Sequence, residues 1–339
     1  MTALRDSPMF ARAGIAAAIA LVSAAVIVVA ADGDERDAPA PRGGGGWGAL
    51  APSIFERSEV GAARIGDRIY VVGGFISSGG TTGRMARYDI SSSGWKRMPD
   101  LPIEVNHPGV ASLRGKLYLL GGNWPARGQN AKSPRLYRFD PKRKRWRRLG
   151  DAPTARGALG LVGNGRKLYA VGGATKSNQR VRRLEVFNTK RKRWRRGPKL
   201  PTGRNHIGVA ILSGRLYVTG GRPGPTYNAQ TTVESYSLKG KRWRTEPPLQ
   251  TARSGHATVA AGGGLVAFGG EELGIPDGQT IEQVEFFDPE TGEWTPLPDM
   301  VTPRHGLGGV AKGARVFALE GGPQPGLHYS RALEYLDVP

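Results

Sequence analysis

The order of apolar and polar residues along the chain predicts short β-strands in repeated groups. From Leu117 to Leu149 the sequence reads LYLLGGNW, then a loop, then RLYRFDPKRKRWRRL. One apolar run ends at Gly121-Gly122, a second spans Arg135 to Asp140, and a third contains Trp146. A glycine pair that closes an apolar strand is typical of positive φ or of close backbone approach, and Asp-Pro opens a turn. The stretch therefore predicts three strands.

Two constant spacings repeat this unit along the chain. A Trp lies 23 residues before the aromatic or apolar residue that precedes each glycine pair, in Trp47 and Tyr70, Trp95 and Tyr118, Trp146 and Tyr169, Trp194 and Tyr217, Trp243 and Val266, and Trp294 and Phe317. A second aromatic residue lies 7 residues before the next Trp, as in Phe187 and Trp194. Length varies only after the glycine pair, which places insertions in loops. Each unit therefore predicts four strands, A to D, with the glycine pair after B and the Trp in D.

These residues resemble the kelch-repeat family, which combines the glycine pairs and spaced Trp with a Glu in strand C. Here the strand C residues are Glu185, Glu234, Glu285 and Glu334. The resemblance covers Trp47 to Asp337 and implies an all-β fold, a six-bladed β-propeller with one four-stranded blade per repeat. The last repeat stops after strand C, so we expect Trp47 to supply its strand D and close the ring.

An apolar run precedes the repeats. Residues 13–31 have about the length of a transmembrane helix; Arg5 and Arg12 precede the run and four acidic residues follow it, which favours an extracytoplasmic body. We interpret the run as an uncleaved single-pass signal anchor. The alternative is a signal peptide cleaved after Val29-Ala30-Ala31, which would leave a secreted protein. The predicted organisation is a basic tail (1–12), the membrane anchor (13–31), a Pro- and Gly-containing linker (32–46) and the propeller (47–339).

Composition excludes several kinds of chemistry. The chain has no Cys, which rules out disulfides, thiolate metal sites, Cys catalysis and the Cys–Tyr copper site of some kelch oxidases. No catalytic triad, phosphate-binding loop or metal-ligand spacing occurs, so we expect no metal and no cofactor. The formal net charge of +21 favours partners with negative charge, the alternative being a solvated Arg-rich surface.

The first residues of strand A are candidate ligand-binding residues, because strand A is innermost in a propeller and its start borders the channel. We call this the top face. A ring of guanidinium and imidazole groups there suits a carboxylate or phosphate ligand. Alternatively, these side chains bond carbonyl groups of neighbouring blades. The ring comprises Arg57, His107, Arg156, Arg204, His206, Arg253, His256, Arg304 and His305.

Glu320 departs from the repeat pattern, because it takes the position of the first glycine in the other pairs. Beside Arg304 and His305, this carboxylate is a candidate base or a group that orients a sugar hydroxyl. An ion pair or a bulge is the alternative.

The opposite, bottom face carries basic turns between strands C and D. In the second and third repeats these turns are Lys142, Arg143, Lys144, Arg145 and Lys190, Arg191, Lys192, Arg193. Blade four adds Lys239, Lys241 and Arg242, whereas the fifth repeat has Glu290 and Glu293, so the charge forms a sector. We expect this sector to face anionic lipid or a cell-surface polyanion, and an external location argues against nucleic acid.

These features together predict a membrane-anchored, extracytoplasmic propeller that acts as a binding or interaction module. Its ligand would be anionic, a carbohydrate or a protein, with an acidic sugar or a protein at the top face. The resemblance also allows a carbohydrate-active enzyme such as a sialate-type epimerase, with Glu320 as base and an Arg of the ring holding the carboxylate. The fold does not decide between these classes.

Overall fold

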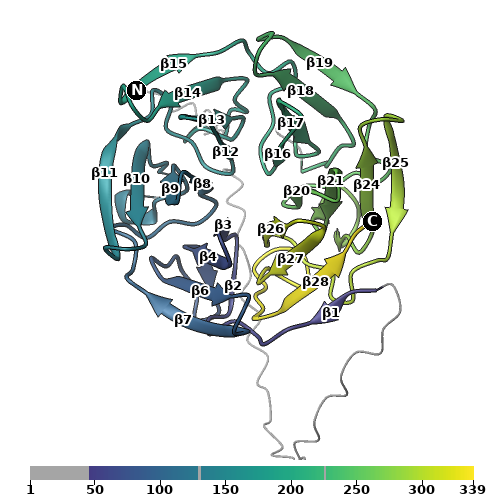
Figure 1. The fold of residues 1–339 in the computed structure, drawn as a ribbon, viewed down its shortest axis with the longest axis horizontal. Helices are drawn as coiled ribbons and strands as arrows, with labels where there is room; N and C mark the ends of the chain where they lie inside the picture. The colour runs from purple at the N-terminus through teal and green to yellow at the C-terminus, as the bar shows by residue number, and fades with distance from the viewer. Residues whose placement is uncertain (1–45, 129–130, 225–226) are drawn as a thin grey trace, which may run out of the picture. The chain divides into compact units, whose positions relative to one another are not determined.

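The four short strands of each repeat pair into one antiparallel sheet. A computed structural model describes residues 46–128, 131–224 and 227–339, in which six such sheets surround a central channel (Figure 1). Blade I contains β3 (Gly61–Ile65), β4 (Arg68–Val72), β6 (Met85–Asp89) and β7 (Gly94–Met98); blade II contains β8 (Gly109–Leu113), β9 (Lys116–Leu120), β10 (Arg135–Asp140) and β11 (Arg145–Asp151); blade III contains β12 (Gly160–Asn164), β13 (Lys167–Val171), β14 (Leu184–Asn188) and β15 (Arg193–Arg196).

The remaining blades follow the same order. Blade IV contains β16 (Gly208–Leu212), β17 (Arg215–Thr219), β18 (Val233–Ser237) and β19 (Trp243–Glu246); blade V contains β20 (Ala257–Ala261), β21 (Gly264–Phe268), β24 (Val284–Asp288) and β25 (Glu293–Leu297); blade VI contains β26 (Gly308–Lys312), β27 (Arg315–Leu319), β28 (Leu333–Asp337) and β1 (Gly48–Ala49). Two small ribbons lie in the loops, β2 (Arg57–Ser58) with β5 (Phe75–Ile76) and β22 (Glu271–Glu272) with β23 (Gln279–Thr280), and a 3₁₀ turn η1 spans Pro125–Arg127.

The constant spacings of the sequence reflect strand register and packing between blades. Phe187 in β14 lies directly opposite Trp194 in β15, and their ring centroids are 5.1 Å apart. Tryptophans of strand D also bond the preceding blade, as Trp146 Nε1 does with the carbonyl oxygen of Pro99. A shift of one residue would turn each ring to the other face of its sheet, so the strands tolerate no insertion.

The amino-terminal strand closes the ring, as predicted. In blade VI, Gly48 pairs with Tyr335 and Ala49 with Glu334, so β1 is the outermost strand (Figure 1). Trp47 is buried against Phe268 of blade V and donates from Nε1 to the carbonyl oxygen of Pro298. Trp47 therefore makes the same interblade contact as Trp95, Trp146, Trp243 and Trp294.

The glycine pairs adopt the left-handed conformation expected from the sequence. Gly121 has φ 71°, and a Cβ added there would lie 2.4 Å from the carbonyl oxygen of Arg156 in the next blade. Gly122 has φ 94° and its N–H donates to that same carbonyl. The pair thus lets two blades approach closely at the top face.

The part of the chain that the structure describes contains no helix with the length and apolar character of a membrane span. The predicted anchor over residues 13–31 and the linker over 32–46 lie outside the described residues, except Gly46. Both therefore stay predictions.

Candidate functional site

The five arginines of the predicted ring point into the blades and not into the channel. Each is at most 1% exposed. In blades III to VI the guanidinium forms an ion pair with the Glu of strand C in its own blade: Arg156 with Glu185 (3.2 Å), Arg204 with Glu234, Arg253 with Glu285 (2.7 Å) and Arg304 with Glu334 (2.7 Å). Burial lowers the pKa of Arg156 to about 10, against the opposing effect of Glu185, so it stays charged at neutral pH. In these four blades the arginine therefore ties the start of its blade to strand C of the same blade.

Backbone carbonyl oxygens also accept hydrogen bonds from the arginines. Arg204 Nη2 donates to the carbonyl of Val218 at 2.8 Å, and Arg253 Nη1 donates to that of Gly269 at 3.0 Å. The sequence offered the alternative that these arginines bond backbone carbonyls of neighbouring blades. The structure confirms the bonds to carbonyls, but these carbonyls belong to the same blade.

Blades I and II depart from this pattern in different ways. Blade II has Val105 where the others have Arg and Tyr137 where others have Glu, and both side chains are buried in one hydrophobic cluster. Blade I retains Arg57 but has Ala86 at the Glu position. Its missing carboxylate comes from Glu320 of the adjoining blade VI, through bonds of 2.8 Å to Arg57 Nε and Nη2.

Glu320 is therefore the ion-pair partner of Arg57. It is fully buried, and Ser53 Oγ also donates to its Oε1 at 2.6 Å. A carboxylate with no exposed surface cannot face a sugar in the channel. Glu320 is therefore an ion-pair partner, as the alternative interpretation held, and the prediction that it acts as a base is wrong. No contact in the described residues then favours the epimerase alternative.

A closed ring of backbone hydrogen bonds forms the channel mouth at the top face. One residue of each blade belongs to it, two positions after the buried arginine or, in blade II, after Val105, and each has positive φ between 51° and 63°. From His107 onward, the N–H of each member donates to the carbonyl of the preceding member at 2.8–3.0 Å. The ring closes where the N–H of Val60, next to Glu59, donates to the carbonyl of Gly306 at 3.2 Å. We call it the collar: Glu59, His107, Ala158, His206, Gly255 and Gly306.

Three collar side chains meet over the channel. Glu59 Oε2 lies 3.0 Å from His107 Nε2, and the rings of His107 and His206 are 4.9 Å apart at an interplanar angle of 86°. Ligating atoms of Glu59, His107 and His206 all lie within 4.8 Å of one another. The hollow beneath them measures about 100 Å³. Typical small-molecule sites measure about 300–1,000 Å³, so this hollow suits an ion or a few waters.

A second carboxylate and a third imidazole adjoin the collar. His305 Nδ1 lies 3.2 Å from Glu59 Oε1 and 3.6 Å from Glu271 Oε2, while the other oxygen of Glu271 pairs with Arg222. Burial alone would lower the pKa of His305, but the hydrogen bond and charge of Glu59 raise it. Conversely, burial alone would raise the pKa of Glu59, yet His107 and His305 hold it well below its usual value. Burial, followed by the charge of Arg222, keeps the pKa of His206 well below its usual value.

Two other histidines lie away from this cluster. His256 is buried between blades IV and V, where its Nε2 lies 2.9 Å from Thr219 Oγ1, and burial keeps its pKa well below the usual value. His328 lies exposed in a loop of blade VI. The structure thus brings together His107, His206 and His305 of the predicted ring.

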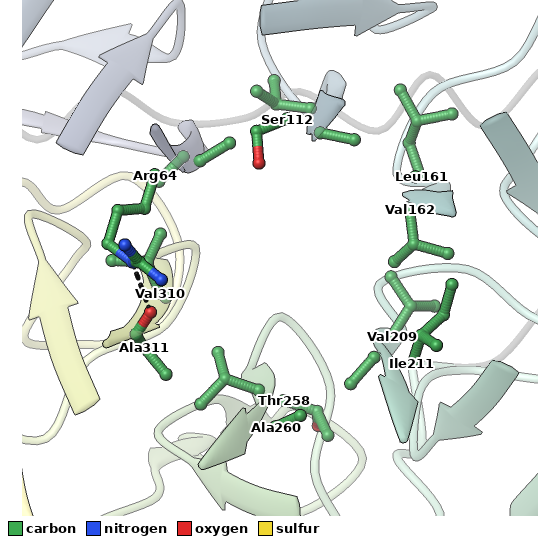
Figure 2. Close-up of a pocket in the computed structure, with 18 residues that line it drawn as sticks. Arg64, Ser112, Leu161, Val162, Val209, Ile211, Thr258, Ala260, Val310 and Ala311 are labelled. Carbon is green, nitrogen blue, oxygen red and sulfur yellow. Dashed lines mark hydrogen bonds between the residues drawn. The ribbon is translucent and has the colours of Figure 1, made fainter. Parts of the chain in front are cut away.

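The channel below the collar is lined by few polar or charged side chains. Toward the bottom face it widens to about 310 Å³ and is lined by residues of the six innermost strands, mostly small or aliphatic (Figure 2). Among those residues Arg64 is the charged one, and its Nε donates to the carbonyl of Ala311 at 2.6 Å (Figure 2).

The basic turns of blades II and III are exposed as predicted. All eight side chains of Lys142–Arg145 and Lys190–Arg193 are exposed. Next to the second turn, a groove of about 860 Å³ runs between blades III and IV. Its walls hold six exposed cations, Lys167, Arg191, Arg193, Arg195, Arg196 and Lys241, together with Tyr169 and Tyr236, and none of its lining residues is acidic. We call it the basic groove.

Asn188 explains why the basic groove lacks a carboxylate. In the other four blades whose strand B begins with Lys or Arg, that residue forms an ion pair: Arg68 with Asp89, Lys116 with Asp140, Arg215 with Glu246 and Arg315 with Asp337. In blade III, Lys167 lies opposite Asn188. Asn188 Oδ1 accepts the turn N–H groups of Lys190 and Arg191, as Asp140 Oδ1 does for Lys142 and Arg143. Asn188 therefore makes the same turn hydrogen bonds as Asp140 but carries no negative charge to pair with Lys167.

Reasoning from sequence missed three residues of these sites. Glu59 lies two positions after Arg57, but only the collar shows that it meets histidines of blades II and IV. Glu271 directly follows the glycine pair of the fifth repeat, the region in which the sequence predicts only a loop of variable length. Asn188 could have been found by aligning the last residue of strand C, where four of six repeats have Asp.

Comparisons with known proteins agree with this architecture. The family profile described as the KLHDC2/KLHL20/DRC7 Kelch-repeats domain matches residues 106–322, and that of the Kelch motif matches residues 56–102. No curated protein matches the chain. The solved structure titled "Structure of YjhT" superposes with a TM-score of 0.74, covering 84% of this chain and 95% of that chain at 14% sequence identity. At that identity the likeness shows a common fold alone.

Proposed function

Because this chain belongs to the kelch-repeat family, whose propellers are typically interaction modules, we propose that it is a binding module held at the outer side of a membrane. In this proposal, residues 13–31 anchor the chain. The basic turns and the basic groove of blades II to IV dock on an anionic surface formed by lipid headgroups. The collar and the top loops then face away from the membrane, toward a further ligand or protein partner.

The observation that carries the proposal is the acid-free basic groove. Six cations converge on one space, and none of them has an ion-pair partner among the described residues. Mutual repulsion of such charges is unfavourable, and a bound anion relieves it. The volume of about 860 Å³ lies within the usual range for small-molecule sites and admits a phosphorylated headgroup.

The chain topology supports docking by this face. Trp47 precedes β1, which begins at the bottom end of blade VI beside the last residues of β28. The roughly 15 residues between the predicted anchor and Trp47 reach at most about 50 Å when extended. An anchored chain of this kind would keep the basic face close to the bilayer.

The experiment measures partition of residues 46–339, which contain every strand of the closed ring, onto vesicles with and without anionic lipid. Each basic residue near an anionic surface contributes about 1 kcal/mol, an estimate made for the cytoplasmic leaflet. Replacing Lys190–Arg193 by Ser should therefore weaken binding by up to about three orders of magnitude. Asn188→Asp should weaken it less, by giving Lys167 a partner. Binding should also fall with added salt.

The matched control removes four exposed cations from the top of blade III, by Ser substitution at Lys176, Arg182, Arg183 and Lys199. This variant should bind as the wild type does. Equal binding to neutral vesicles, or equal loss in the control, would leave the basic sector as a solvated surface. Retention on an immobilised polyanion without vesicle binding would assign the basic groove to a cell-surface polyanion.

A further inference from the structure

The collar does not itself require ligating side chains. Its six positions are joined by backbone N–H and carbonyl groups alone. Ala158, Gly255 and Gly306 fill three of them, so a residue without polar side-chain atoms suffices for the fold. Glu59, His107 and His206 occupy the other three at φ values of 53–54°, where L-residues are strained. The fold therefore leaves these three side chains without a structural explanation.

Hydrogen bonds orient two of the three side chains toward a common point. His107 Nδ1 lies 2.6 Å from Asn106 Oδ1 and 3.4 Å from Asn123 Nδ2, so these two side chains hold the ring with Nε2 toward Glu59. His107 Nε2 lies 3.0 Å from Glu59 Oε2. In the tautomer with its proton on Nδ1, both facing atoms are acceptors, and a cation between them, either a proton or a metal ion, relieves their repulsion. The opposite oxygen of Glu59 is held by His305 Nδ1 at 3.2 Å, which fixes the carboxylate.

Buried polar atoms without partners also point to a ligand. His206 Nδ1 and Glu271 Oε2 have no hydrogen-bond partner among the described residues, and Glu271 is only 3% exposed. Glu271 Oε2, His305 Nδ1 and a Glu59 oxygen lie within 4.8 Å of one another and form a second set beside the first. Unsatisfied buried polar atoms are uncommon in folded proteins and often mark an ion or water site.

We propose that Glu59, His107 and His206 bind a divalent transition-metal ion of the Zn²⁺ class at the channel mouth. Two imidazoles and one carboxylate are a common ligand set for such ions when a position is left open for water. Asn106 and His305 are the outer partners that orient His107 and Glu59, as outer hydrogen bonds do at metal centres. The ligands come from blades I, II and IV, so they lie far apart in the sequence and form no recognisable motif.

The test uses the full-length chain, freed of metal with a chelator and titrated with Co²⁺ as a spectroscopic substitute for Zn²⁺. We expect one Co²⁺ per chain with visible d–d absorption, displaced by Zn²⁺. His206→Ala and His107→Ala install the residue that blade III already has in the collar, so both should fold. Each should lower affinity more than the 10- to 100-fold typical of losing an outer partner. Glu59→Gln should do the same with little change in shape.

The control is His328→Ala, which removes an exposed histidine outside the collar. It should bind Co²⁺ as the wild type does, and melting temperatures verify that each variant is folded. Absence of Co²⁺ uptake by the wild type would overturn the proposal and leave the cluster as carboxylate–imidazole pairs that share protons. Uptake that persists in His206→Ala and Glu59→Gln, or is lost equally in His328→Ala, would also overturn it.

Discussion

Arg57 takes its ion-pair partner, Glu320, from blade VI and not from its own blade. Removing Glu320 should lower the stability of the protein, and a second substitution that places a Glu in blade I should restore it. Glu320→Gly gives blade VI the glycine that the other five blades have at this position. The change relieves a left-handed residue with φ 54°, worth about 1–2 kcal/mol. It also leaves Arg57 buried and without its carboxylate, which costs about 3–5 kcal/mol. The net expectation is destabilisation by about 1–4 kcal/mol.

Adding Ala86→Glu should restore most of the loss. Ala86 pairs with Val71 as Glu285 pairs with Ala267, so a Glu at position 86 occupies the same register. Arg57 Nη1 donates to the carbonyl of Gly73, the equivalent of the Gly269 carbonyl bonded by Arg253. The guanidinium thus already lies where the other blades have their ion pair.

The assay is thermal and urea unfolding of the wild type, both single variants and the double variant. For a domain of this size, 1 kcal/mol shifts Tm by roughly 2 °C, so Glu320→Gly should melt about 2–8 °C lower. Ala86→Glu alone should also destabilise, because it places a second buried carboxylate beside Arg57 and Glu320. The reasoning fails if Glu320→Gly is as stable as the wild type, or if the double variant is no more stable than Glu320→Gly.

Two further predictions concern the blades. Trp47→Ala removes the buried ring that joins blade VI to Phe268 and should cost about 3–5 kcal/mol by urea unfolding, and an unchanged midpoint would contradict its closing role. Val105→Arg places an unpaired charge in blade II and should prevent stable folding, whereas Val105→Arg with Tyr137→Glu recreates the ion pair of blades III to VI and should recover folded protein, as judged by circular dichroism.

The sequence contained enough information for the fold because its two spacings report physical register. The 7-residue spacing is the pairing of Phe187 with Trp194 across a turn. The 23-residue spacing runs from the Trp in strand D of one blade to strand B of the next blade. Their recurrence at Trp47 predicted closure by the first strand, which pairs with β28. Glycine after strand B was likewise correctly interpreted, because its φ is required by contact between blades.

The candidate sites were less accessible from the sequence. The residue types predicted that Arg57 and Arg156 lie at the start of strand A. They did not predict the direction of the side chains, which depends on the position of the Glu that each arginine pairs with. The Glu of strand C was already part of the family pattern. Blade II lacks both the Arg and the Glu, and this joint loss indicates in the sequence that the two residues pair with each other. The collar cluster depends on ring geometry that brings Glu59 beside His107 and His206, and no linear spacing reports it.

Closure by β1 also orders events during synthesis. Gly48 is made early, whereas its partner Tyr335 belongs to β28, the last strand of the propeller in chain order. Blade VI therefore cannot be completed until β28 has left the ribosome, and β28 presents an open edge until β1 pairs with it. The ion pair of Arg57 with Glu320 spans the same seam, so it too forms only at this step. Five blades can assemble in the order of synthesis, and the closing strand must wait for the sixth.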